Sequence, residues 1–361
     1  MTKLSKVVVG VAVVGGLAII GAQFARQLTG RAPVPTEKTK VGVILPLTGE
    51  LSFVGQEIEK GIQLALADFP EAGIKVVVED NESLNTSKAV SALQKLVFVD
   101  KVNVVLNDAV NTAKALVSTV DQAQISTIIV WDSNEQLRNL HSHIFGFGFS
   151  TEKAGQDAAH LAVSTQAAKK VAVISLHDEW SEIIANAFAE ETKSLGAEVV
   201  IHEKFNVGET DFRTVIAKIK NQKVDAVFFP FPFPDSIINF AKQARELNLE
   251  ASLITGDGFV GVDLKTAGEV LENVYAVLPW VTDPALETKY AARFGNSNSV
   301  SLAFAGLGYD AVKLIVDTKT SLESSHQAIN SETLYQALKQ VESQGFLGTT
   351  NFGTSNIADK Q

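Results

Sequence analysis

Short, continuously apolar runs alternate with amphipathic stretches from Lys40 onward, and this alternation constrains the fold of the chain most strongly. Most of the apolar runs show no polar face, which indicates strands covered on both sides, as in a parallel sheet between helices. The predicted strands are Val41–Leu45, Ile74–Val78, Val102–Leu106, Ser126–Val130, Ile144–Phe149, Lys170–Ser175, Glu198–Phe205, Ala226–Phe229, Ser252–Thr255 and Val274–Leu278.

Amphipathic helices are predicted between these strands, and Asp211 and Asp235 stand where a carboxylate would cap a helix start. Repeated β-α units imply right-handed crossovers and a doubly wound sheet. Two successive series of about five strands therefore predict an α/β protein with two similar lobes. The helices are expected at Gln56–Phe69, Ser87–Val99, Lys153–Gln166, Glu179–Leu195, Asp211–Asn221 and Asp235–Leu247.

Ligands of doubly wound sheets bind outside the carboxyl ends of the strands, where the following loops converge. Six loops occupy that place in this chain, and we expect function to lie in them. They are Pro46–Gly55, Asn107–Thr112, Trp131–Gln136, His177–Ser181, Pro230–Asp235 and Gly256–Gly261.

Length, charge and cysteine usage narrow the possible functions. A chain of 361 residues has room for two cores. Its first 31 residues hold four basic residues and no acid, which leaves 27 basic against 41 acidic residues beyond them, a formal charge of −14. So acidic a body repels phosphate backbones, and we expect no nucleic acid partner. The sequence has no cysteine, which excludes disulfides, thiolate metal sites and a lipidated cysteine.

The N-terminal segment points to export. Lys3 and Lys6 precede an uncharged run of 18 residues, 7–24. Secretory signals have apolar stretches of roughly 7–15 residues, whereas a membrane-spanning helix needs about 20. A cleaved signal peptide and a retained transmembrane anchor therefore both stay open. With either, residues 1–40 comprise this segment and a linker, and the domain that follows is extracytoplasmic, in the periplasm or at the cell surface.

An ordered series of motifs resembles the leucine/isoleucine/valine-binding proteins, which are type I periplasmic binding proteins that serve ABC importers. The similarity spans roughly residues 40 to 355, and each motif is weak alone but specific in its order and spacing. The motifs are VGVILPLTG at 41–49, GIQLA at 61–65, SNEQL at 133–137, GETDF at 208–212, QAREL at 243–247 and YDAV at 309–312.

This resemblance implies a topology that periodicity does not give. Three crossovers near Gly146–Ser150, Leu278–Trp280 and Gly345–Asn351 would form a three-stranded hinge. The first lobe would hold residues 41–147 and 280–346, and the second would hold 148–279 and 347–361. Such a hinge permits closure around a ligand. The resemblance also implies a monomer with no cofactor, which hands its ligand to an ABC permease.

The resemblance assigns binding roles to particular residues. Asp257 occupies the place of the acid that binds the ligand's ammonium group; the alternative is a Gly-Asp-Gly turn with local backbone bonds. Ser133 matches a threonine that donates to the ligand carboxylate, and it could equally cap the next helix. Trp180 falls near an aromatic lid, and Phe233 falls where an aromatic ring stacks on the ligand, although both could simply pack.

Departures from the family pattern leave the ligand open. The serine that grips the ligand carboxylate aligns with Val110, and a common cysteine pair is replaced by Leu84 and Ala109. Losing a hydroxyl that bonds a buried charge costs about 1.5–3 kcal/mol. Asn111 or the neighbouring threonine could restore a donor. An aromatic residue usually precedes Gly55, and here Phe53 stands beside that position.

Other motifs carry less weight. Gly256–Gly261 fits G-x-G-x-x-G, but no acid ends the next strand, as a dinucleotide site requires. His141 and His143 lack a third metal ligand nearby, so we expect exposed loop histidines and no metal site. The segment from His177 to Glu179 fits ligand binding or helix capping better than catalysis.

We therefore expect a non-enzymatic, extracytoplasmic solute-binding protein that captures a small amino-acid-like ligand between two lobes for an ABC importer. The alternative is a ligand-sensing module of a membrane signalling system, with a ligand that is not an amino acid.

Overall fold

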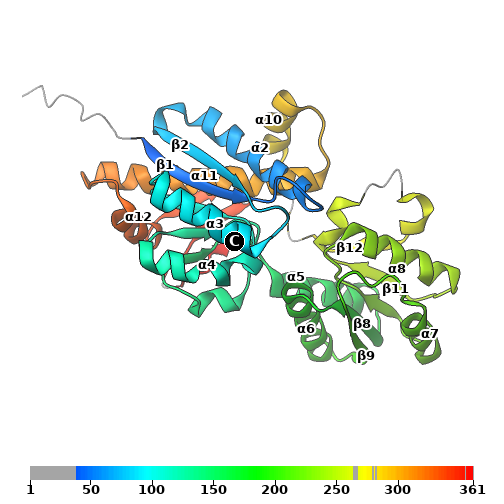
Figure 1. Cartoon of the computed structure of the whole chain (residues 1–361). Coiled ribbons are helices and arrows are strands. Elements are labelled where there is room, and N and C mark those ends of the chain that lie inside the picture. The colour runs from blue at the N-terminus through cyan, green and yellow to red at the C-terminus, as the bar shows by residue number, and fades with distance from the viewer. Residues whose placement is uncertain (1–37, 263–266, 279, 281–282, 354, 361) are drawn as a thin grey trace, which may run out of the picture. The chain divides into compact units, whose positions relative to one another are not determined.

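The chain forms two five-stranded parallel sheets, each covered by helices on both faces (Figure 1). The computed structural model describes residues 38–262, 267–278, 280, 283–353 and 355–360. The predicted signal or anchor, residues 7–24, lies outside the described residues. We call the first sheet with its helices the first lobe, and the second sheet with its helices the second lobe.

The first sheet has the strand order β2-β1-β3-β4-β6, and all its neighbouring strands run parallel. Its strands are β1 (Thr39–Leu45), β2 (Ile74–Asp80), β3 (Val104–Asn107), β4 (Thr127–Ile129) and β6 (Ile144–Gly146). The helices of this lobe are α2 (Ser52–Asp68), α3 (Thr86–Gln94), α4 (Val110–Ala123), α10 (Pro284–Phe294), α11 (Ser299–Ser324) and α12 (Ser331–Leu338).

The second sheet has the order β12-β11-β10-β8-β9 and is also parallel. Its strands are β8 (Lys170–Leu176), β9 (Glu198–Phe205), β10 (Ala226–Phe228), β11 (Ser252–Thr255) and β12 (Val274–Ala276). Its helices are α5 (Thr151–Ala159), α6 (Glu179–Ser194), α7 (Arg213–Gln222) and α8 (Pro234–Glu246). Counted in chain order, both sheets read 2-1-3-4-5. The predicted α/β fold class and the duplication of fold are confirmed.

Alternate residues of each central strand serve two different hydrophobic cores, which explains the continuously apolar runs. In β1, Val41 and Val43 pack into a core with α2 and α11, whereas Ile44 packs into one with α3 and α4. In β8, Ala172 and Ile174 pack with α7 and α8, while Val171 and Val173 pack with α5 and α6. A strand with helices on both sides has no solvent face to keep polar.

Side-chain caps fix several helix starts. Asp178 accepts a hydrogen bond from Ser181 N (2.9 Å) at the start of α6, and Ser150 accepts one from Lys153 N (3.2 Å) at α5. Asp211 accepts from Arg213 N (3.1 Å) at the start of α7, as predicted. The predicted cap at Asp235 is wrong, because Phe233 is the N-cap of α8 and Asp235 lies inside its first turn. There its charge still suits the helix dipole.

The long helix α11 crosses α2 at close range in the first lobe. A β-carbon on Gly61 would lie 1.8 Å from the Ala305 carbonyl oxygen, and one on Gly308 would lie 2.0 Å from that of Ile58. Each helix therefore presents a glycine to the other's backbone. This close packing holds α11, a helix from the C-terminal part of the chain, against the lobe whose sheet is formed by the N-terminal part.

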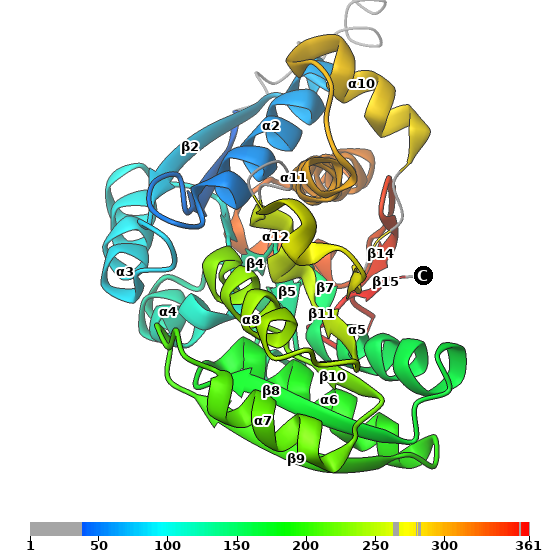
Figure 2. The ribbon, with the colours of Figure 1, turned by 90° about the vertical axis from the view of Figure 1, so that its right-hand side faces the viewer.

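The C-terminal residues pack differently from our expectation. We assigned 347–361 to the second lobe and a crossover to Gly345–Asn351. In the structure β13 (Glu342–Gly345) and β14 (Gly348–Asn351) form an antiparallel hairpin, and β13 packs against α11. Figure 2 labels β14 of this hairpin. The Asp310 carboxylate of α11 fixes the turn of the hairpin, because it accepts hydrogen bonds from the backbone N–H groups of Phe346 and Leu347, at 2.8 Å each.

The tail after this hairpin continues along the first lobe. Ile357 bridges to Gly146 beside β6, and Ala358 N donates to the Gly146 carbonyl oxygen at 2.7 Å. The Phe352 ring lies 4.9 Å from that of Phe145. Hydrophobic contact and backbone pairing therefore hold these residues to the first sheet, and the strand β15 (Asp359–Lys360) adds to the hairpin.

The chain passes from the first sheet to the second directly after β6. Here β5 (Asp132–Ser133) and β7 (Phe149–Ser150) pair in a two-stranded parallel ribbon, at the predicted crossover Gly146–Ser150. The predicted return at Leu278–Trp280 includes residue 279, which is not described. Among the residues that the structure does describe, none of the helices combines the length and apolarity needed to cross a membrane.

The glycine contacts of α2 and α11 generate a stability prediction. Gly61→Ala should destabilise the protein by about 1–3 kcal/mol through overpacking, although alanine favours helix over glycine by about 1 kcal/mol. Ala67→Gly, at an exposed position of the same helix, gives the propensity effect alone and should destabilise by roughly 0.5–1 kcal/mol. Urea denaturation measures both. A Gly61→Ala protein more stable than the parent would contradict the close packing.

Candidate ligand-binding site

Loops from the carboxyl ends of both sheets converge on one cavity of about 80 Å³. The first lobe contributes Leu51, Leu84, Ala109, Asn111, Trp131 and Asp132 to its lining. The second lobe contributes Asp178, Trp180, Pro232, Phe233, Asp257 and Gly258. Each of the six loops singled out from the sequence supplies at least one of these residues.

The strand order explains why these loops meet. In the 2-1-3-4-5 order the chain reverses direction of winding between its first and third strands, and the loops there diverge to leave a crevice. Asn111 follows β3 at that point of the first sheet, and Asp178 and Phe233 follow β8 and β10 at the same point of the second. The cavity thus lies where parallel sheets of this order place their ligands.

Two glycines hold Asp257 at the cavity wall. A β-carbon on Gly256 would lie 3.2 Å from the Trp180 ring, so this ring packs directly over the backbone. A β-carbon on Gly258 would lie 2.1 Å from the Phe231 carbonyl oxygen. Gly258 must therefore be glycine for the short 3-10 helix η5 (Asp257–Gly261) to pack against the backbone that follows β10, and Gly256 leaves room for the Trp180 ring of α6. The Gly-Asp-Gly sequence is thus a packing requirement as well as a turn.

In the first lobe, two aspartates bind the backbone at the start of α4. Asp132 Oδ1 accepts a hydrogen bond from Val110 N at 2.9 Å. Asp108 Oδ1 accepts from Ala109 N (2.7 Å) and from Thr112 Oγ1 (3.0 Å). Because the first N–H groups of a helix have no partner within the helix, such carboxylates stabilise its start.

The carboxyl groups around the cavity are hard to ionise. Desolvation and, to a smaller extent, the charges of Asp257 and Asp108 raise the pKa of Asp132 to about 7, against the Val110 N–H, which lowers it. Desolvation likewise raises the pKa of Asp257 to about 6 and that of Asp108 to about 6. The pKa of Asp178 is raised by the same cause, despite its bonds at the start of α6. The carboxylate form is unfavourable here because burial removes its hydration.

Four of the six predicted site residues line the cavity: Asp257, Trp180, Asn111 and Phe233. Ser133 does not line it; its Oγ donates to the Gly148 carbonyl oxygen (3.2 Å), and its side chain is 2% exposed. Nor does Ser133 cap the next helix, because Asn134 takes that role by accepting from Gln136 N.

Phe53 packs against the core beneath α2 instead, and Leu51 takes its place at the cavity. Sequence reasoning missed the carboxylate of Asp132, which stands one residue before the Ser133 chosen from the family pattern. The sequence did offer a signal for it, because Asp132 is an acid at the second position of a predicted ligand loop, next to Trp131. Asp178 was noted for helix capping or ligand contact, and it caps α6 while lining the cavity.

The motifs set aside from the sequence have structural explanations. The Gly256–Gly261 loop opens a five-residue 3-10 helix, not the long α-helix of a dinucleotide site. His143 is buried rather than exposed as expected, and its ring stacks on Tyr335 at 4.0 Å. Within the described ranges, no three histidine, aspartate or glutamate side chains are placed to hold a metal ion.

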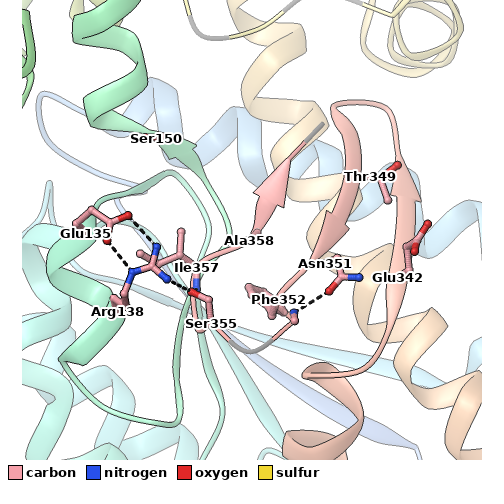
Figure 3. Close-up of a pocket in the computed structure, with 11 residues that line it drawn as sticks. Glu135, Arg138, Ser150, Glu342, Thr349, Asn351, Phe352, Ser355, Ile357 and Ala358 are labelled. Carbon is pink, nitrogen blue, oxygen red and sulfur yellow. Dashed lines mark hydrogen bonds and ion pairs between the residues drawn. The ribbon is translucent and has the colours of Figure 1, made fainter. Parts of the chain in front are cut away.

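A larger hollow of about 650 Å³ lies elsewhere, between η3 (Glu135–Asn139), β14 and the C-terminal tail (Figure 3). Of its lining residues, only Glu135 belongs to the six predicted loops. Arg138 projects into it but is held by two bonds to the Glu135 carboxylate and one to Ser355 Oγ (2.7 Å). The one cationic side chain in the described lining of this hollow is thus already paired, and the hollow lies away from five of the six predicted ligand loops, so the candidate site is the smaller cavity between the lobes.

The buried carboxyl groups generate a pH prediction. The pKa of Asp132 is about 7 in the folded protein, against about 4 in the unfolded chain. Between these pH values the folded protein binds more protons than the unfolded chain, so its stability falls as the pH rises. Asp132→Asn removes the contribution of this group to the pH dependence of stability. In thermal denaturation without ligand, the melting temperature of Asp132→Asn should rise relative to that of the parent as the pH is raised from 5 to 8. An equal difference at every pH would contradict a raised pKa at this position.

Curated relatives match most of the described chain. An "Amino acid binding protein" from Pseudomonas aeruginosa is 30% identical over 256 residues, which cover 68% of each chain. A "Leu/Ile/Val-binding protein BraC3" from Rhizobium johnstonii is 26% identical over 324 residues, covering 85% of each.

Solved structures share the fold. A branched-chain amino acid transporter substrate-binding protein, LivJ from Streptococcus pneumoniae in complex with isoleucine, superposes with a TM-score of 0.77 at 25% identity, covering 90% of this chain and 94% of that one. A leucine-binding protein, LivK from Thermotoga maritima, superposes with a TM-score of 0.76 at 21% identity, covering 89% of this chain and 93% of that one. The model of the family described as "Periplasmic binding protein" matches residues 38–359. Its members are extracytoplasmic solute binders rather than enzymes, and this chain belongs to the periplasmic binding protein family.

Proposed function

We propose that this protein captures a small, amino-acid-like solute bearing an ammonium group in the cavity between its lobes and delivers it to an ABC permease. The observation that carries the proposal is the cavity itself, which both sheets build with the loops at their carboxyl ends and which contains the Asp257 carboxylate. The names of the relatives support an amino-group ligand, since they are amino acid and Leu/Ile/Val-binding proteins.

Each lining residue has a role suited to its chemistry. Asp257 accepts hydrogen bonds from the ammonium group, which supplies the counter-charge that a buried carboxylate needs. Trp180 and Phe233 enclose the apolar body of the ligand from the second lobe, and Asn111 offers an uncharged amide from the first. Ser133 and Phe53 support the wall from behind in this conformation rather than contacting the ligand.

Closure of the lobes is the step that couples binding to transport. At the rim of the cleft, Lys114 of α4 and Glu179 of α6 form an ion pair across the lobes, with Nζ–Oε1 at 2.9 Å. Its lysine is half-exposed, so the pair contributes at most about 1 kcal/mol. The ligand must therefore supply most of the free energy that favours the closed form. A monomeric protein with one cleft suffices for this cycle.

The binding prediction uses calorimetry with the proteinogenic amino acids, their amides and their amines. At least one should bind, and small-angle scattering of the same mixture should show a monomer that becomes more compact. The proposal fails if none binds and if native mass spectrometry of protein purified from its source shows no co-purified small molecule.

Asp257→Asn should lower the affinity for the ligand found in this way at least tenfold, because the ammonium group loses its counter-charge while the side chain keeps its shape. Asp235→Asn is the matched control, since it makes the same change at an exposed position of α8 outside the cavity. Equal affinities of the two variants would remove Asp257 from the binding role.

For the N-terminal segment we propose export with residues 7–24 either cleaved as a signal peptide or retained as an anchor. Expression of the full chain followed by membrane fractionation and N-terminal sequencing distinguishes the two. Export predicts protein outside the cytoplasm in both cases, and replacing Val13 and Val14 by aspartate should trap it inside. Unchanged export of that variant would contradict a targeting role for the segment.

A further inference from the structure

The charge of the cavity is unbalanced. Three of its twelve described lining residues are aspartates, and none is lysine, arginine or histidine. An amino acid zwitterion brings a carboxylate together with its ammonium group, and that carboxylate would enter beside these acids. Like charges at close range in a desolvated site are strongly unfavourable.

At two helix starts beside the cavity, the chain's own aspartates already bind backbone N–H groups that could otherwise receive an anion. At α4, the Val110 N–H donates to Asp132, and the preceding Ala109 N–H donates to Asp108. At α6, the Ser181 N–H donates to Asp178. Helix N-termini are the usual substitute for a cationic side chain in binding carboxylates, and here both carry an aspartate instead.

The third helix start at the cavity offers little to an anion. The helix α8 begins at Pro234, which has no backbone N–H. The residues before it, Pro232 and Phe233, present apolar surface to the cavity. The second lobe therefore faces the ligand with carboxylates and rings.

Asp132 is a second carboxyl group in the wall of the cavity. The residue lines the cavity and is 92% buried (8% exposed), and its Oδ1 accepts a hydrogen bond from Val110 N. A carboxylate has room for more than one donor, and the Asp132 and Asp257 carboxyl groups come from opposite lobes. Both line the same cavity, and their charges are near enough to act on each other, so a cation bound there would meet both carboxyl groups.

We propose that the ligand is an organic ammonium ion without a free carboxylate, held between Asp132 and Asp257 and enclosed by Trp131, Trp180 and Phe233. This inference rests on the proposed function and names the ligand class of the same cleft. An organic cation fits better than a metal ion, since the described side chains form no metal cluster. Indole and phenyl faces attract a cation and also cover its apolar body. Asp132 is the residue that determines this specificity.

Matched ligand pairs that differ by one carboxylate test the proposal. Calorimetry compares leucine with 3-methylbutylamine, phenylalanine with 2-phenylethylamine, and alanine with ethylamine, with leucinamide as a neutralised third form of leucine. We expect the amine of at least one pair to bind at least tenfold more tightly than its amino acid. An amino acid that binds as tightly as its amine, or more tightly, overturns the proposal and leaves the proposed function standing.

Binding by neither member of any pair also overturns it, and the co-purified small molecule then decides separately whether the proposed function survives. Asp132→Asn keeps an oxygen that can accept from Val110 N, so the start of α4 is preserved. This variant should reduce the amine's advantage at least tenfold, whereas Asp235→Asn should leave it unchanged. An unchanged preference in Asp132→Asn would show that Asp132 does not determine specificity.

Discussion

The desolvation of carboxylates between the two lobes is the constraint on which the rest of this structure depends. Asp132 and Asp257 approach each other from opposite sheets in a cavity without a cationic side chain among its described lining. Such groups remain there only if a proton or a bound cation compensates their charge. With the ligand absent, that charge opposes the approach of the lobes. A bound ammonium group converts the same repulsion into attraction, which gives a ligand differential affinity for the closed form.

The duplicated sheet explains how the chain brings these groups together. Both sheets have the same strand order, so both leave a crevice beside their first strand at the carboxyl edge. The first lobe is completed only when α11 packs on α2 through Gly61 and Gly308, more than 200 residues after β1. The carboxyl-terminal hairpin and tail then cover the same lobe.

The sequence predicted the strands and the ligand loops well because both follow from local patterns. Continuous apolar runs such as 170–175 require two buried faces, and a loop after each strand follows from the topology. The chain's own use of its donors was not predictable in this way. That Asp132 rather than a ligand occupies the Val110 N–H depends on the geometry between two loops 22 residues apart. The family pattern predicted Ser133 as a donor to the ligand, but its hydroxyl instead donates to the Gly148 carbonyl oxygen.

The course of the C-terminal residues was also mispredicted, for a related reason. A two-residue turn between β13 and β14 has no strong local signal, and its position is set by the distant Asp310 carboxylate. Tertiary contacts decide such segments, and the resemblance to a family supplied a crossover that this chain replaces with a hairpin.

The most direct test of this account is a crystal structure with the tightest-binding member of the amine and amino acid series. We predict a ligand nitrogen within hydrogen-bond distance of both Asp132 and Asp257, with the Val110 N–H still bonded to Asp132. A ligand carboxylate on the Val110 N–H, with the Asp132 side chain turned away, would contradict it.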